Sequence, residues 1–142
     1  MTIVDRSAII SRSARSIYDL VDDVASYPLF LPWCAQTDVK ERSAERVVAT
    51  IHVSFKGVRQ SFTTENRNVP GESIDMSLVN GPFRHLSGVW RFDSLGDQAS
   101  KVSLHLEYQL SSRLLEKVAG PAFEHMANTF VDAFVRRAET LR

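Results

Sequence analysis

The sequence predicts an α+β fold in which a curved antiparallel sheet of seven strands wraps around one long C-terminal helix. Two patterns predict it. Residues 112–142 place apolar side chains at the three-and-four spacing of one helix face, over about 30 residues and therefore some 40 to 45 Å. Residues 35–110 instead alternate apolar and polar side chains with a period of two. A helix of that length needs a broad apolar surface, and we expect the sheet to supply it without closing completely.

The chain begins with a strand and a helix. Thr2–Ile10 is rich in β-branched residues, which favour a strand, and Ser13 can cap a helix over Ala14–Val24. The buried stripe of this helix is expected to contain Ile17 and Leu20. The expected order of elements is then strand, helix, one further helical turn, six strands and the long helix.

An unusual segment follows the first helix. Residues 27–34 read Tyr-Pro-Leu-Phe-Leu-Pro-Trp-Cys, and the two prolines limit this stretch to one helical turn. Two interpretations are open for Tyr27, Phe30 and Trp33. They form a lid over a cavity mouth or a wedge that dips into lipid, or they form a corner packed against the preceding helix.

Turn-forming residues divide the alternating region into six strands joined by hairpins, which predicts an antiparallel meander. The turns are Ser43-Ala44-Glu45, Lys56-Gly57, Asn68-Val69-Pro70-Gly71, Asn80-Gly81-Pro82 and Gly96-Asp97. One face of the sheet is apolar. Three polar residues, Gln60, Thr64 and Asn66, share this face of their strand with Phe62. Two interpretations are open: they place polar groups at the cavity, or the strand twists and turns them out to solvent. Gly88 marks a position where its strand can bend.

The long helix has recognisable ends. Ser111 or Ser112 can cap its start, and Arg136, Arg137 and Arg142 suit its negative C-terminal end. Gly120-Pro121 lies inside it, either as a hinge or as a simple bend around the twisted sheet.

Composition limits the function. The chain of 142 residues is expected to form one domain spanning residues 1–142, and 17 basic residues balance 17 acidic ones. No global field therefore attracts nucleic acid, and we expect no contact with DNA. A single cysteine, Cys34, and no apolar signal segment in Met1–Ser7 predict a cytoplasmic location, with any membrane contact peripheral.

The residue types that carry out catalysis are not arranged as a site. The four histidines at positions 52, 85, 105 and 125 are scattered and predict no metal site. The chain has no Gly-x-Ser-x-Gly elbow, no phosphate-binding glycine loop and no Cys-His pair of a nucleophilic enzyme. Asp22-Asp23 is expected only to face water. We therefore expect no catalytic residues and a protein that is not an enzyme.

Several motifs together resemble one family. They are Val21-Asp22-Asp23-Val24, Tyr27-Pro28, Phe30-Leu31-Pro32-Trp33-Cys34, Leu78-Val79-Asn80-Gly81-Pro82-Phe83 and Leu86-Ser87-Gly88-Val89-Trp90-Arg91-Phe92. Their order along the whole chain is similar to that of the coenzyme Q-binding and ribosome association toxin (RatA) branch of the START-like, polyketide cyclase/dehydrase superfamily. The resemblance implies the helix-grip fold, an internal hydrophobic cavity, and neither a metal nor a covalent cofactor.

The resemblance implies two functions, and both are kept as expectations. The first is binding of a hydrophobic ligand such as ubiquinone, in support of respiration, with no cofactor beyond that ligand. The alternative is binding to the large ribosomal subunit, which blocks subunit association, and here Arg136, Arg137, Arg12 and Arg15 are the candidate basic residues. The residues expected to bind the apolar ligand are Phe30, Trp33, Phe62, Met76, Phe83, Leu86, Trp90, Tyr108, Phe123, Met126 and Phe130.

Overall fold

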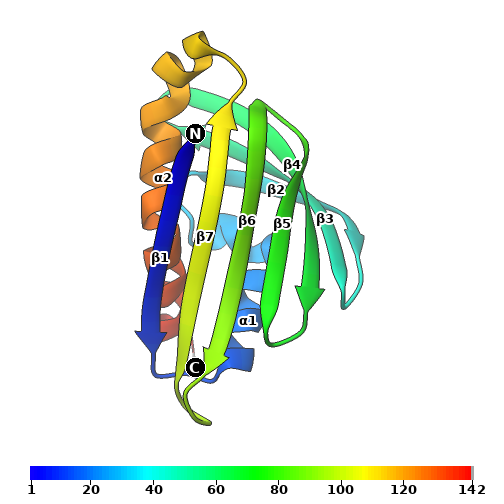
Figure 1. Cartoon of the computed structure of the whole chain (residues 1–142), viewed down its shortest axis with the longest axis vertical. Coiled ribbons are helices and arrows are strands. Elements are labelled where there is room, and N and C mark those ends of the chain that lie inside the picture. Colours follow the sequence, from blue (N-terminus) through cyan, green and yellow to red (C-terminus); the bar gives the residue numbers. More distant parts are fainter. Residues whose placement is uncertain (142) are drawn as a thin grey trace.

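The computed structural model describes residues 1–141 and contains a sheet, two α-helices and one 3₁₀ helix (Figure 1). The elements are β1 (Thr2–Ile10), α1 (Ala14–Asp22), η1 (Val24–Leu29), β2 (Cys34–Arg42), β3 (Arg46–Phe55), β4 (Val58–Val69), β5 (Ser73–Asn80), β6 (Phe83–Ser94), β7 (Ser100–Leu110) and α2 (Arg113–Thr140).

Within residues 1–141 the seven strands form one antiparallel sheet in the order β1-β7-β6-β5-β4-β3-β2. Strands β2 to β7 are a meander, as predicted, and β1 returns to pair with β7 from Thr2 opposite Tyr108 to Ile10 opposite Ser100. The sheet curves around α2, which runs along its inner face behind β1 and β7 in Figure 1. The expected helix-grip α+β architecture is confirmed.

Both helices begin at the predicted caps. The hydroxyl of Ser13 accepts a hydrogen bond from Ser16 N, and that of Ser112 accepts one from Leu115 N, each at 3.1 Å. The helix predicted over residues 14–24 ends two residues earlier, because the backbone at Asp23 leaves the helical region and a 3₁₀ helix follows. Residues 113–140 form one continuous helix through Pro121, and Arg142 lies outside the described residues.

The first turns of α2 are less buried than the spacing predicted. Val118 is one of the apolar residues of 112–142 that follow the spacing of one helix face, but it is 66% exposed, because the start of α2 extends beyond the end of the strands (Figure 1). From Ala119 onward the apolar stripe is buried as predicted, through Phe123, Met126 and Phe134.

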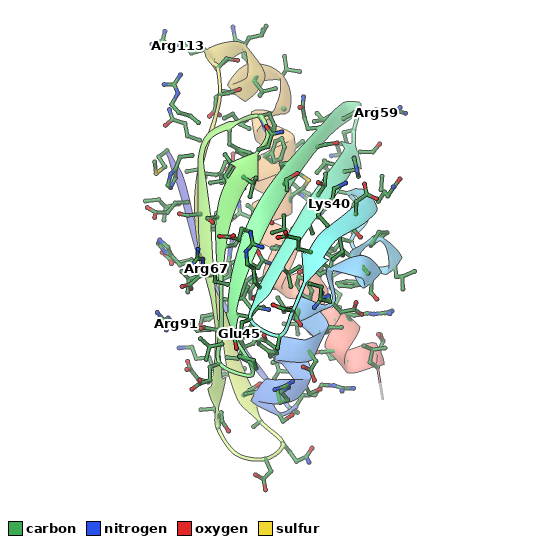
Figure 2. The ribbon with its side chains drawn as sticks, turned by 90° about the vertical axis from the view of Figure 1, so that its right-hand side faces the viewer. Lys40, Glu45, Arg59, Arg67, Arg91 and Arg113 are labelled. Carbon is green, nitrogen blue, oxygen red and sulfur yellow. The ribbon has the colours of Figure 1, made fainter. Side chains whose placement is uncertain are left out.

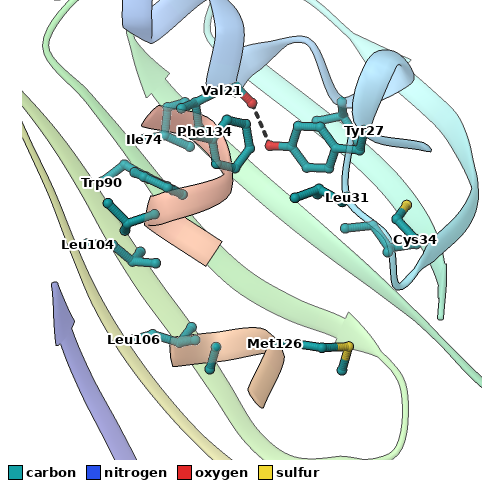
Figure 3. Close-up of a cluster of buried hydrophobic side chains, with 14 of the residues drawn as sticks. Val21, Tyr27, Leu31, Cys34, Ile74, Trp90, Leu104, Leu106, Met126 and Phe134 are labelled. Carbon is teal, nitrogen blue, oxygen red and sulfur yellow. Dashed lines mark hydrogen bonds between the residues drawn. The ribbon is translucent and has the colours of Figure 1, made fainter. Parts of the chain in front are cut away.

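The deepest part of the core joins α1, α2 and the sheet (Figure 3). Phe134 is fully buried, with its ring 5.3 Å from that of Tyr27 and 5.4 Å from that of Trp90. The buried hydroxyl of Tyr27 donates a hydrogen bond to the carbonyl of Val21 at 2.5 Å. Of the two interpretations of the aromatic segment, Tyr27 therefore fits the packed corner.

The other face of the sheet is polar and charged. Figure 2 shows Lys40, Arg59, Arg67 and Arg91 projecting from the strands, and all four are exposed. This face leaves the inner side of the sheet as the place for an apolar site.

Candidate apolar site

A hollow of about 70 Å³ lies between the sheet and the middle of α2. Its walls are almost entirely apolar and come from β3 to β7, from α2 and from the segment before β2. The lining residues are Trp33, Ile51, Phe62, Met76, Phe83, Leu86, Leu106, Tyr108, Phe123, Met126, Ala127 and Phe130. The sheet and the helix therefore do not close completely, as the sequence predicted.

The turn between β5 and β6 positions one aromatic wall. Gly81 has a φ of +151°, and a Cβ built there would lie 2.5 Å from the Cβ of Phe62. Only glycine permits this approach. The turn consequently holds Phe83 against Phe62 at 5.4 Å and against Phe123 of α2 at 5.3 Å, so that three aromatic rings meet in the wall of the hollow.

A second glycine determines how much space remains beneath the sheet. A Cβ on Gly88 would lie 2.8 Å from Met76 Cε and 3.2 Å from Leu106 Cδ1, two residues that line the hollow. The missing side chain of Gly88 therefore provides room for both of them.

Trp33 and Phe130 form the wall nearest to the aromatic segment. Their rings lie 5.6 Å apart, and Trp33 is only 6% exposed. Trp33 also lines a groove on the outside of the molecule, so its side chain forms part of the boundary between the hollow and this groove. This is the place that the lid interpretation assigned to Trp33.

Nine of the eleven predicted site residues line the hollow, and Phe30 and Trp90 do not. Trp90 faces inward as predicted, but farther along β6, where it packs on Phe134 in the filled part of the core. Phe30 packs on Phe134 at 5.1 Å and lines the outer groove. Period-two alternation predicts which side chains of a strand point into the core. It does not predict which of them lie beside the hollow and which lie where other side chains fill the core.

Sequence reasoning about the site missed three lining residues. Ile51 and Leu106 lie on strand faces that the alternation identified as apolar, and Ala127 lies on the buried stripe of α2. The available signal was their position on those faces. Choosing mainly large and aromatic side chains left out these smaller aliphatic ones.

The polar residues of β4 do not reach the hollow. Thr64 and Asn66 are 3% and 9% exposed, so the strand does not turn them out to solvent, and Gln60 is half-buried. None of the three belongs to the lining. The polar groups that were one alternative for the cavity wall therefore lie outside the hollow.

Within the described lining, Tyr108 is the one residue with an acid-base side chain. Burial raises the pKa of its hydroxyl above the ordinary value of 10, so it is neutral at physiological pH. Among residues 1–141, no three His, Cys, Asp or Glu side chains are grouped as metal ligands. In the same range, no helix is long and apolar enough to cross a bilayer.

The histidines and the acidic pair lie away from the hollow. His52 is hydrogen-bonded to Asp38 and His105 to Asp5, both at the outer face of the sheet. Asp22 does more than face water, since it accepts a hydrogen bond from Asn68 at 2.8 Å.

The candidate basic residues do not form one dense face. Arg15 is paired with Asp19 at 3.0 Å, while Arg136 and Arg137 line the outer groove beside Trp33. Among the described residues, these two arginines have no carboxylate within ion-pair distance.

Comparison with known proteins gives a consistent result. The family described as polyketide cyclase/dehydrase and lipid transport matches residues 10–135. The ribosome association toxin RatA of Pseudomonas aeruginosa is 46% identical over 140 residues, covering 99% of this chain and 97% of that protein. The mitochondrial coenzyme Q-binding protein COQ10 homolog B of Xenopus laevis is 27% identical over 136 residues, covering 93% of this chain and 56% of that protein.

The fold is also found in solved structures. A START superfamily protein from Mycobacterium smegmatis superposes with a TM-score of 0.77 at 21% identity, covering 99% of both chains. At that identity the likeness concerns the fold alone.

Proposed function

The chain belongs to the polyketide cyclase/dehydrase and lipid transport family, in the branch of the RatA and coenzyme Q-binding proteins, and from that premise we propose that it binds a quinone or isoprenoid ligand such as ubiquinone between its sheet and α2. One observation carries the proposal: the space left there is lined almost wholly by apolar groups. Burial of apolar ligand surface, worth about 25 cal/mol per Å², supplies the affinity. Trp33, Phe62, Met76, Phe83, Leu86, Tyr108, Phe123, Met126 and Phe130 are its proposed contacts.

The ligand requires the hollow to expand. Its volume of about 70 Å³ is less than half of the roughly 150 Å³ of an apolar cavity that admits benzene. Met76 and Met126 are suited to such a change, because their unbranched side chains adapt to irregular spaces. Movement of Trp33 would connect the hollow with the groove outside.

We propose a binding site, not a catalytic one. General acid-base chemistry needs a titratable group within reach of the reacting atoms. The described lining contains no carboxylate and no imidazole, and the Tyr108 hydroxyl acts only as a neutral hydrogen-bonding group. No covalent step is assigned to the hollow.

Lipid extraction tests this proposal directly. Protein purified from cells rich in ubiquinone is extracted with organic solvent, and the extract is analysed by mass spectrometry. The delipidated protein is then titrated with a short-chain ubiquinone. We expect a co-purifying quinone or isoprenoid and saturable binding. Protein that carries no such lipid and binds none in the titration would refute the proposal.

Association with the large ribosomal subunit is the second candidate. It is favoured by the 46% identity to a protein named ribosome association toxin over nearly the full length of both chains. The zero formal net charge leaves local arginines as the available contacts to ribosomal RNA.

Cosedimentation with purified large subunits at increasing salt tests the second candidate. Salt should weaken the association, and Arg136→Gln with Arg137→Gln should weaken it further. Arg113→Gln, at the opposite end of α2, is the matched control. If the double variant cosediments like the unmodified protein, these arginines are not the contact.

A further inference from the structure

An open groove of about 420 Å³ lies outside Trp33, between the aromatic segment and the second half of α2. Phe30, Pro32 and Trp33 form one side of it. The other side is a stripe of α2 that begins at His125 and ends at Thr140.

The groove is positively charged. Arg136 and Arg137 both line it, and no carboxylate belongs to its described wall. The guanidinium of Arg137 lies over the ring of Phe30, with Cζ 5.3 Å from the ring centre. Its Nε is buried and has no hydrogen-bond partner among the described residues. A buried guanidinium N–H without an acceptor is unfavourable, so an acceptor that reached it as Arg137 moved off the Phe30 ring would gain a hydrogen bond.

The end of a helix explains only part of this arrangement. Its partial negative charge attracts arginines, and an exposed side chain satisfies that preference. The attraction between the guanidinium and the Phe30 ring explains where Arg137 lies, but it leaves Nε without an acceptor among the described residues. The two full positive charges also exceed the half charge of the helix end, so an anion in the groove is favoured overall.

The groove and the hollow share one wall. Trp33 lines both, and its ring packs against Phe130 on the hollow side. A ligand that displaces Trp33 would therefore contact arginines at one end and apolar side chains at the other. A phosphate monoester carries about −1.5 to −2 charges at neutral pH, which matches two guanidinium groups.

We propose that the groove binds the phosphate group of an amphiphile whose hydrocarbon part enters the hollow past Trp33. The inference rests on the proposed binding function of the hollow. It adds that the preferred ligand is anionic at one end, and it assigns phosphate recognition to Arg136 and Arg137.

The test compares geranyl phosphate with geraniol, which has the same isoprenoid chain and no charge. In calorimetric titrations, we expect the phosphate to bind at least about tenfold more tightly at low salt, as charge-assisted hydrogen bonds imply. Arg136→Gln and Arg137→Gln should each remove most of this preference. Arg113→Gln, an exposed arginine at the other end of α2 (Figure 2), should leave it unchanged. Because Arg136 is exposed, its variant is not expected to disturb the core.

Each result bears on a different part of the proposal. Equal affinity for the two ligands would overturn phosphate recognition, while binding of geraniol would still support the hollow. If inorganic phosphate binds as tightly as geranyl phosphate and geraniol does not bind, the hollow fails and the link between the two sites is overturned. Loss of the preference in the Arg113 variant as well would show a general effect of charge and would also overturn the assignment.

Vesicles identify the source of the phosphate. Phosphatidylcholine vesicles with and without phosphatidic acid are sedimented with the protein and with the arginine variants. Arginine-dependent binding to phosphatidic acid in addition to geranyl phosphate supports a membrane lipid as the source. Binding to geranyl phosphate alone supports a free amphiphile.

Discussion

Gly88→Ala should fill part of the hollow without unfolding the protein. The new Cβ would meet Met76 Cε at 2.8 Å and Leu106 Cδ1 at 3.2 Å, so both lining side chains must move toward the hollow. Overpacking a core usually destabilises a protein by about 1 to 3 kcal/mol, and the cost here should be at the low end because Met76 presents the free end of a flexible side chain. Replacing a glycine in a strand by alanine stabilises the folded state by roughly 0.5 to 1 kcal/mol, which offsets part of this cost. The free energy of unfolding should therefore fall by about 1 kcal/mol or less.

The effect on binding should be larger than the effect on stability. Space lost for one ligand methylene costs about 0.8 kcal/mol, or about fourfold in affinity, and space lost for two costs about fifteenfold. Calorimetric titration with a short-chain ubiquinone measures this change, and urea denaturation measures stability. A stable variant that binds the quinone as tightly as the unmodified protein would show that the ligand does not occupy the hollow.

Gly120→Ala is the matched control for this experiment. Gly120 lies in α2 outside the hollow, and apart from its chain neighbours its new Cβ would meet only Glu116 Oε2, at 3.4 Å. Alanine in a helix gains up to about 1 kcal/mol over glycine, but the ring of Pro121 crowds the Cβ of the residue before it, so the free energy of unfolding should change by less than about 1 kcal/mol. Affinity for the quinone should not change.

Three further predictions concern other parts of the molecule. Tyr27→Phe leaves the buried carbonyl of Val21 without its donor, so urea denaturation should show a loss of about 1 to 2 kcal/mol, and no loss would mean that water replaces the hydroxyl. The hydrogen bond that the protonated His105 ring donates to the Asp5 carboxylate raises the pKa of His105 above 6.5, so its stabilising effect is complete below pH 6.5 and disappears as pH rises through the folded pKa. In an NMR titration Asp5→Asn should lower that pKa, and an unchanged pKa would contradict the assigned cause. Burial raises the pKa of Cys34 to about 11, so iodoacetamide should alkylate it far more slowly in the folded protein than in urea, whereas equal rates would show an accessible thiolate.

The fold could be predicted from the sequence because its local signals agree with one another. Alternation identified the inner faces of β3 and β7, and glycines such as Gly81 marked the hairpins between strands. The spacing on α2 identified its buried stripe from Ala119 onward. Where the prediction was wrong, as at Val118, the reason was the length of the helix relative to the sheet, which no local pattern encodes.

The candidate site could be predicted only in part. Residue type and strand face brought Phe62 and Phe123 to the correct region. They placed Trp90 there too, although Phe134 packs against it and fills the core at that position. The volume of the hollow depends on contacts between separate elements, such as that between Gly88 and Met76, and a one-dimensional pattern does not contain them.

The pairing of β1 with β7 has a consequence for the order of folding. Thr2 lies opposite Tyr108, so the first strand must wait for the seventh before its backbone groups are paired. Contacts between such distant parts of a chain form late, and folds dominated by them take milliseconds to seconds. During synthesis β1 and the meander must remain without α2 until the last residues emerge, with their apolar faces open to chaperones and to other nascent chains.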